Sequence, residues 1–253
     1  MNKNTKVALI IGANRGIGFG LVKNLLQDKA NYMIYASYRS EDKSQDLLSL
    51  AQEYPEKLKC LVFDAIKSNN YSYLLDSIVS ETEKIDLCIN CIGVLDDGVT
   101  FPERKVEELS SESLSHCFTL NTIPTLLLAK TLKSLLLKSE SPKFVAISAK
   151  VGSISDNRLG GWYAYRISKA ALNMAIKNLS IEFKRLHKNS MIVAIHPGTT
   201  QTELSKAFIK HAAKSYIVHQ PEQAGKNILQ LINRLSPNET GLFFSWDGSK
   251  ISW

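Results

Sequence analysis

A tyrosine and a lysine four residues apart, Tyr165 and Lys169, are the side chains of this sequence best suited to moving a proton. Residues four apart on a helix lie on one face, so the phenol and the ammonium can point into one pocket. A phenol titrates near ~10 and exchanges protons poorly at neutral pH, but a fixed cation beside it lowers its pKa. The same short pattern occurs on ordinary exposed helices, so the rest of the sequence must decide between the two interpretations.

The 253 residues suit one large α/β domain, and with 44% hydrophobic and 22% charged residues they can form a packed core. The net charge of +7 indicates an anionic partner. Because the lysines are scattered and lack interleaved aromatics, a phosphorylated small molecule is favoured over nucleic acid. The polar start and the lack of an apolar run of ~20 residues lead us to expect a cytoplasmic protein that does not enter a membrane.

Four cysteines, Cys60, Cys88, Cys91 and Cys117, lie in apolar or helical contexts. Cys88 and Cys91 have CxxC spacing, but a zinc site would need a second pair of ligands and a redox motif would normally open a helix. We expect buried free thiols in a reducing compartment and no metal site.

A glycine-rich turn follows the first apolar run, residues 7–11, and precedes an amphipathic stretch, residues 19–27. The turn reads Gly12-Ala13-Asn14-Arg15-Gly16-Ile17-Gly18. Glycines let the backbone approach a pyrophosphate, and the helix N-terminus offers it unpaired N–H groups. Strand, turn and helix together predict a dinucleotide cradle.

Arg39 stands at the end of the second strand, residues 32–37, where enzymes that prefer NAD usually carry an acid. A base there accommodates a 2′-phosphate, so Arg39 with Arg15 favours NADP(H) over the alternative of a solvated surface arginine. Asp64 follows the third strand and is placed to accept a hydrogen bond from an adenine amino group.

Strands and helices alternate along the whole chain, which predicts a single α/β domain over residues 1–253. We expect a Rossmann-type, doubly wound, seven-stranded parallel sheet flanked by helices, with ligands at the carboxyl ends of its strands. The predicted strands are residues 7–11, 32–37, 58–63, 85–89, 143–147, 191–195 and 242–246, and the further helices are residues 41–53, 70–80, 110–139, 163–186 and 221–235.

Two of the predicted helices have special features. Pro124 within residues 110–139 cannot donate to the carbonyl of Leu120, so we expect a kink around Asn121. The helix of Tyr165 has two apolar seams, which favours a homodimer or homotetramer through residues 110–138 and 163–186, the alternative being a contact within the chain. Residues 199–220 are mixed in character and are interpreted as a substrate lid.

The chain resembles the short-chain dehydrogenase/reductase family over its whole length, and more narrowly the C-factor and sniffer-type branch related to carbonyl reductases. The resemblance rests on the glycine turn, the Tyr165/Lys169 pair and several further matches, which are Asp64, Asn90 with Gly93, Asn121, Val151-Gly152-Ser153-Ile154, Gly160-Gly161-Trp162-Tyr163-Ala164, Ser168-Lys169-Ala170-Ala171-Leu172-Asn173, and Pro197-Gly198 with Thr202. It implies that Tyr165 exchanges a proton with a carbonyl or alcohol substrate during hydride transfer. It also implies that Lys169 lowers the tyrosine pKa and holds the cofactor ribose, and that Asn121 positions a water.

The resemblance also implies which residues contact NADP(H). They are Gly12, Asn14, Arg15, Gly16, Ile17, Gly18, Arg39, Asp64, Ala65, Asn90, Gly93, Tyr165, Lys169, Pro197, Gly198, Thr200 and Thr202.

Three positions depart from the family pattern. Ile11 replaces a usual threonine before Gly12, and Asn90-Cys91-Ile92-Gly93 keeps only the ends of its motif. Where the family commonly has two serines after the fifth strand, this chain has Ser148 and Ala149. The substrate carbonyl is therefore polarised by Ser148, which we favour, or by Ser153, or its polarisation is weakened.

Two classes of function remain open. The first is an NADPH-dependent carbonyl reductase, and the second is a C-factor-like signalling or scaffold protein that binds the dinucleotide with little or no turnover. Ala149 favours the second and the intact Tyr165, Lys169 and Asn121 favour the first. A serine hydrolase is excluded because no G-x-S-x-G turn is present.

Overall fold

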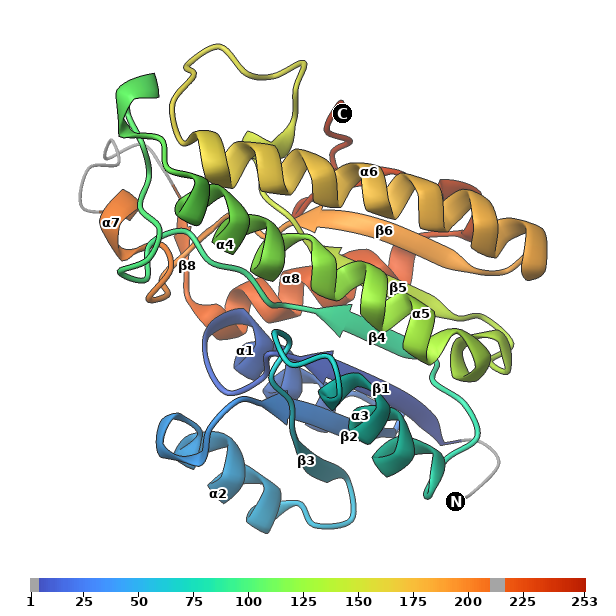
Figure 1. Cartoon of the computed structure of the whole chain (residues 1–253). Coiled ribbons are helices and arrows are strands. Elements are labelled where there is room, and N and C mark those ends of the chain that lie inside the picture. Colours follow the sequence, from blue (N-terminus) through green and yellow to red (C-terminus); the bar gives the residue numbers. More distant parts are fainter. Residues whose placement is uncertain (1–4, 210–216) are drawn as a thin grey trace.

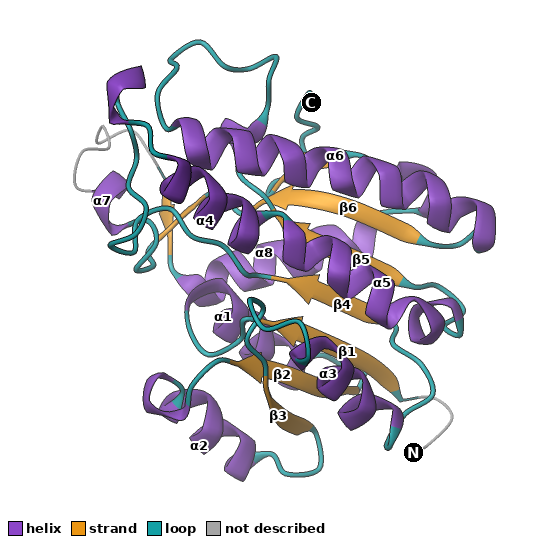
Figure 2. Ribbon diagram, in the orientation of Figure 1, coloured by secondary structure: helices purple, strands orange, loops and turns teal. Residues whose placement is uncertain are grey.

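A parallel sheet of seven strands runs through the middle of the molecule in the computed structural model, which describes residues 5–209 and 217–253 (Figure 2). The strands follow the order β3-β2-β1-β4-β5-β6-β9 and all pair in parallel. Their bounds are β1 (Lys6–Ile11), β2 (Tyr32–Tyr38), β3 (Leu58–Val62), β4 (Leu87–Asn90), β5 (Lys143–Ile147), β6 (Met191–His196) and β9 (Phe243–Ser245). The prediction of a doubly wound, seven-stranded parallel sheet is confirmed.

Helices cover both faces of this sheet (Figure 1). One face packs against α1 (Gly16–Leu26), α2 (Gln45–Glu53) and α8 (Pro221–Arg234), and the other packs against α3 (Asn70–Val79), α5 (Ile123–Leu137) and α6 (Tyr163–Leu186). The remaining helices are α4 (Ser111–Asn121) and the short α7 (Lys206–Ile209). A small parallel pair, β7 (Thr199–Thr200) with β8 (Val218–His219), was not predicted from the sequence.

Strand β1 shows why the apolar runs of this chain form central strands. Ala8 and Ile10 point to the core on the α1 and α8 side, whereas Val7, Leu9 and Ile11 point to the core on the α3, α5 and α6 side. All five are fully buried. A strand covered on both faces needs an unbroken apolar run, which is the pattern that predicted a parallel sheet.

The long helix predicted for residues 110–139 is broken into two helices and not merely kinked. It divides at Thr122 into α4 and α5, with Pro124 in the first turn of α5. Proline suits that position because the first N–H groups of a helix have no partner within the helix. The Thr122 hydroxyl donates to the carbonyl of Ser168 at 2.8 Å, so the break is anchored to the helix that carries Tyr165 and Lys169.

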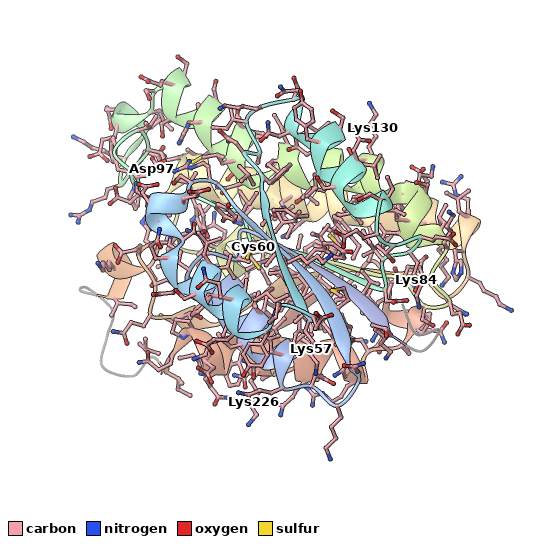
Figure 3. The ribbon with its side chains drawn as sticks, turned by 90° about the horizontal axis from the view of Figure 1, so that it is seen from below. Lys57, Cys60, Lys84, Asp97, Lys130 and Lys226 are labelled. Carbon is pink, nitrogen blue, oxygen red and sulfur yellow. The ribbon has the colours of Figure 1, made fainter. Side chains whose placement is uncertain are left out.

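The predicted oligomer is not tested by a single chain and stays a prediction. Apolar side chains are exposed on both proposed helices, with Ile167, Met174 and Ile181 on α6 and Ile123 and Leu126 on α5. The positive charge is dispersed, because Lys57, Lys84, Lys130 and Lys226 lie at separate places around the molecule (Figure 3). Within residues 5–209 and 217–253, no helix is both long enough and apolar enough to span a bilayer.

Candidate active site

A cleft of about 500 Å³ opens at the carboxyl ends of the central strands. It lies where the strand order reverses, because β1 is flanked by β2 on one side and β4 on the other. Ligands of doubly wound sheets bind at such a switch point. Of the predicted cofactor contacts, the cleft is lined by Gly12, Asn14, Arg15, Gly16, Ile17, Gly18, Arg39, Asp64, Ala65, Gly93 and Thr202.

The glycine turn has the geometry of a phosphate cradle. Gly12 and Gly16 have φ of 76° and 55°, and a Cβ on Gly18 would lie 2.2 Å from the carbonyl oxygen of Gly12. A side chain at position 18 would therefore collide with the backbone of the turn, which packs against the start of α1. The N-cap residue of α1, Arg15, makes no side-chain capping bond, so the helix N-terminus is not closed by its own cap. The residues present fit a bound dinucleotide.

Ser37 replaces the hydroxyl that Ile11 does not provide. Its Oγ, on the neighbouring strand β2, accepts a hydrogen bond from the Gly12 N–H at 3.0 Å. The turn is also tied to β2 by the bond from the Ala13 N–H to the Ser37 carbonyl at 2.8 Å. Sequence reasoning missed Ser37, which also lines the cleft.

Three cations, Arg15, Arg39 and Lys43, line the end of the cleft beside the glycine turn. All three are exposed, and Ser40 lies among the same lining residues. Asn14 links the two segments that carry these cations, because its Nδ2 donates to the carbonyl of Lys43 at 2.9 Å. Lys43 was missed from the sequence, although a second base four residues after Arg39 is a readable signal for an anionic ligand.

The segment after β4 is shaped by Asn90 and Gly93. Asn90 is buried and does not line the cleft; its Nδ2 donates to the Thr125 hydroxyl at 2.9 Å and its Oδ1 accepts from the Ile92 N–H at 3.1 Å. A Cβ on Gly93 would lie 3.3 Å from both Asn121 Oδ1 and Lys169 Nζ. Asn90 therefore holds the turn, and Gly93 leaves room for the two side chains beside it.

Asn121 connects this segment to the helix of Tyr165. Its Oδ1 accepts from the Val94 N–H at 2.7 Å, and its Nδ2 donates to the Val94 carbonyl at 3.0 Å and to the Ser168 hydroxyl at 2.9 Å. The side chain is buried at the end of α4, next to the break at Thr122. It joins α4, α6 and the segment after β4 at one point.

Tyr165 and Lys169 lie on the same face of α6, as their spacing predicts. Lys169 Nζ lies 5.7 Å from the centroid of the Tyr165 ring and donates to the carbonyl of Ile147, a cleft residue, at 3.0 Å. The side chains are 7% and 3% exposed. Neither Tyr165 nor Lys169 is among the residues that line the cleft, and the bond to Ile147 links the lysine to it.

Burial, rather than the neighbouring ammonium, controls the titration of this pair. Burial raises the pKa of the Tyr165 phenol, and the Cys117 thiol acts in the same direction. The sequence-based expectation of a lowered tyrosine pKa is therefore wrong for this structure, because the charge above the ring does not offset the loss of solvent. Burial lowers the pKa of Lys169 to about 8, against weaker opposing contributions from Cys117 and Cys91.

This lowered pKa makes folding stability depend on pH in a defined direction. Between the folded pKa of about 8 and the ordinary value of 10.5, the unfolded chain binds the extra proton, so stability rises with pH. Replacing Lys169 by Met removes this contribution. From about pH 7 to about pH 9, the free energy of unfolding of the wild type should rise by about 1 kcal/mol relative to Lys169→Met. Urea denaturation of both proteins at the two pH values measures the difference between their free energies of unfolding. A difference that is the same at both pH values would contradict the lowered pKa of Lys169.

Neither of the two candidate serines lines the cleft, and the hydroxyls of both donate to other parts of the chain. Ser148 Oγ donates to Asn173 Oδ1 at 2.7 Å, and Ser153 Oγ donates to the carbonyl of Ser252 at 2.6 Å. Each hydroxyl has one proton to donate. In this geometry neither offers that proton to a substrate, so the expectation that Ser148 polarises the carbonyl is not supported by its contacts. Ser148 instead belongs to a buried link that continues from Asn173 Nδ2 to the carbonyl of Gly152.

The segment after β6 contributes Thr202 to the cleft, whereas Pro197, Gly198 and Thr200 do not line it. A Cβ on Gly198 would lie 2.8 Å from Trp246 Cδ1, so this glycine serves packing against the indole. Gln201, Glu203 and Leu204 line the cleft as well. Of the predicted lid, residues 210–216 lie outside the described residues, and the lid stays a prediction.

All four cysteines are free. Cys88 and Cys117 are fully buried, as expected, but Cys91 is partly exposed and lines the cleft, and Cys60 is also only half-buried. Burial raises the pKa of the Cys91 thiol to about 12, so it stays protonated at neutral pH. Among the described residues, no group of three or more His, Cys, Asp or Glu side chains is arranged to hold a metal ion.

The doubly wound sheet, the cleft with its glycine cradle and the buried Tyr165/Lys169 pair on α6 are together typical of a dinucleotide-binding α/β protein. A family model described as short chain dehydrogenase matches residues 6–213. The chain belongs to this family of oxidoreductases. The C-signal protein of Myxococcus xanthus is 27% identical over 172 residues, which cover 68% of this chain and 95% of that protein.

Two solved structures place the chain more narrowly within the family. The NADPH-bound carbonyl reductase from chicken fatty liver superposes with a TM-score of 0.88 at 26% identity, over 99% of this chain and 100% of that one. The carbonyl reductase Sniffer of Drosophila melanogaster gives a TM-score of 0.85 at 26% identity, over 99% of both chains. The resemblance to the C-factor and sniffer-type branch is confirmed.

Proposed function

We propose that this protein is an NADP(H)-dependent oxidoreductase that reduces an aldehyde or ketone to an alcohol, or catalyses the reverse reaction. The observation that carries the proposal is the buried Tyr165/Lys169 pair, whose lysine bonds to the carbonyl of Ile147, a residue that lines the cleft with the glycine cradle and three cations. The likeness to two carbonyl reductases, one of them bound to NADPH, supports both the substrate class and the cofactor.

In the proposed mechanism, Tyr165 gives its proton to the substrate oxygen. When bound, the nicotinamide cofactor supplies the hydride or accepts it. Because burial raises the pKa of Tyr165, the phenol stays protonated at neutral pH, which suits a proton donor and therefore the direction of reduction. Lys169, which bonds to the carbonyl of Ile147, would hold the ribose hydroxyls of the cofactor. Asn121 bonds to Val94 and Ser168 and so fixes α4, α6 and the turn after β4 relative to one another.

Arg39 should set the preference for the phosphorylated cofactor. We expect NADPH to bind much more tightly than NADH, because a 2′-phosphate can take a charge-assisted hydrogen bond from the guanidinium. Arg39→Ala should weaken NADPH binding about tenfold and leave NADH unchanged, since the arginine is exposed and solvent screens part of its charge. Fluorescence titration measures both affinities. Lys57→Ala, which removes an exposed cation elsewhere, is the matched control. Equal affinities of the wild type for NADPH and NADH would contradict the role assigned to Arg39.

A panel of aldehydes, ketones and alcohols, followed by absorbance with each cofactor, tests the proposed activity directly. Turnover of a carbonyl with NADPH supports it, and cofactor binding without turnover of any member of the panel contradicts it.

A second function is favoured by one specific observation. Ala149 replaces the usual second serine, and the hydroxyls of Ser148 and Ser153 bond to other parts of the chain. A C-factor-like signalling or scaffold protein, which binds the dinucleotide and turns over slowly or not at all, is consistent with these contacts and with the likeness to the C-signal protein. The same panel separates the two functions.

A further inference from the structure

Glu103, in the loop between β4 and α4, is a carboxyl side chain that is completely buried. In the part of the chain that the structure describes, Lys169 is the only other buried residue among Asp, Glu, Lys and Arg. Glu103 forms no ion pair there, and its oxygens accept from the Ala164 N–H at 3.3 Å and from the Ser113 hydroxyl at 3.4 Å. Burying a carboxyl group is costly unless its oxygens are bonded, so these two contacts define what Glu103 does.

The contact with Ala164 supplies a cap that α6 does not provide for itself. The first N–H groups of a helix have no partner within the helix, and an acidic group beside them is favoured by the helix dipole. The N-cap residue of α6 is Trp162, and an indole has no oxygen that could accept from these N–H groups. Glu103 Oε2 takes this place from a loop that lies 61 residues away in the sequence. The helix that carries Tyr165 is thus capped by another part of the chain.

The backbone of Glu103 is bound at the same point. Its carbonyl accepts from the Trp162 N–H, and a Cβ on Gly161 would lie 3.1 Å from that carbonyl oxygen. Gly161 has φ of 63°, a conformation that glycine adopts without strain. One residue therefore binds two N–H groups, at positions 162 and 164, directly before Tyr165.

The loop of Glu103 begins at the cleft and is anchored to α4. Asp97 lines the cleft, and its Oδ1 accepts from the Thr100 N–H at 3.2 Å. The Thr100 hydroxyl bonds to the Ser113 hydroxyl at 2.7 Å and to Cys117 Sγ at 3.3 Å, and these three residues are at most 1% exposed. Figure 1 shows this loop, drawn in green, at the end of α6 where the helix begins. A series of contacts thus leads from the wall of the cleft to the first turn of α6.

We propose that Glu103 is a positioning residue that holds Tyr165 in the geometry required for proton transfer. It acts through the first turn of α6 and not by contact with substrate or cofactor. The proposal rests on the proposed function, because it takes Tyr165 as the proton donor. Glu103, Ser113 and Ala164 do not line the cleft, so loss of this anchor should leave cofactor binding intact. A reacting group that is misplaced by about 1 Å can cost about 10²-fold in rate.

Three substitutions separate the bonds of Glu103 from its acidic character. Glu103→Gln keeps the length of the side chain and an oxygen that can accept from the Ala164 N–H, but it is not an acid. Glu103→Asp keeps a carboxyl group but is one methylene shorter, which withdraws the oxygens from that N–H. Glu103→Ala removes the group. Glu107→Ala is the matched control, because Glu107 is an exposed carboxyl side chain on the same loop.

We expect Glu103→Asp and Glu103→Ala to lower kcat for carbonyl reduction by about tenfold or more, with less than about a twofold change in the dissociation constant for NADPH. Glu103→Gln and Glu107→Ala should stay within about threefold of the wild type in both quantities. Amide hydrogen exchange over residues 162–170 needs no turnover, and it should be about tenfold faster in the Asp and Ala variants only. Thermal unfolding checks the fold of each variant.

The outcomes separate this proposal from the proposed function. Unchanged exchange in Glu103→Asp and Glu103→Ala overturns the proposal, and so does faster exchange at unchanged kcat. A loss of kcat in Glu103→Gln as large as in Glu103→Asp also overturns it, because Gln keeps the bond. If Glu103→Ala does not fold, the Asp and Gln variants decide. If the wild type reduces no carbonyl compound while exchange responds as expected, the proposed reductase activity fails and the anchoring of α6 by Glu103 stands.

Discussion

Replacing Tyr165 by Phe should lower NADPH-dependent reduction of carbonyl compounds by about a thousandfold or more. General acid catalysis by a positioned side chain contributes about 10²- to 10⁴-fold, and Tyr165 is the phenol that lies beside Lys169 in this structure. The ring remains in the variant, so packing against Trp162 and the position of α6 should be kept. The dissociation constant for NADPH should change by less than about twofold.

The measurement is steady-state reduction at saturating NADPH, combined with fluorescence titration of the cofactor. Tyr163→Phe is the matched control, because Tyr163 begins the same helix and is not among the residues assigned to the reaction. Wild-type turnover by Tyr165→Phe would refute the mechanism. Loss of activity together with loss of cofactor binding would instead show that the hydroxyl is needed to build the site.

The main features of the fold could be predicted because they depend on short stretches of local sequence. An unbroken apolar run such as residues 7–11 must be covered on both faces, and a glycine turn that follows it must meet the helix at its N-terminus. The alternation of such runs with amphipathic stretches then leaves few possible topologies. The sequence located the break near Pro124. It did not show that the helix divides completely there, because the bond from Thr122 to the carbonyl of Ser168 is a tertiary contact.

The parts of the site that could not be read depend on residues brought together by folding. Ser37 supports the glycine turn from a strand 25 residues away from Gly12, and Glu103 caps α6 across 61 residues. The direction of the Tyr165 pKa shift follows from burial, which the spacing of Tyr165 and Lys169 does not encode. The sequence shows which side chains share a helix face, but their exposure to solvent is set by the loops around them.

Ala149 is the position where one added hydroxyl should raise activity the most. Ile147 lines the cleft, Ser148 faces Asn173, and Ala149 continues in extended conformation with φ of −141° and ψ of 143°. Side chains alternate in an extended chain, so Ala149 points to the same side as Ile147. We expect a serine there to present its hydroxyl on the side of Ile147, whereas the hydroxyls of Ser148 and Ser153 donate to other parts of the chain.

Ala149→Ser should therefore raise kcat for carbonyl reduction by about a hundredfold, since removing one such donor from an enzyme costs about 10²- to 10³-fold. Ala149→Cys is the control, because a thiol has a similar size but donates weakly. Ser148→Ala provides the complementary measurement: it should reduce the free energy of unfolding by about 1–3 kcal/mol by leaving Asn173 Oδ1 without its donor. If Ala149→Ser gives no gain and Ser148→Ala loses about a hundredfold in kcat at unchanged stability, Ser148 must turn toward the substrate during the reaction.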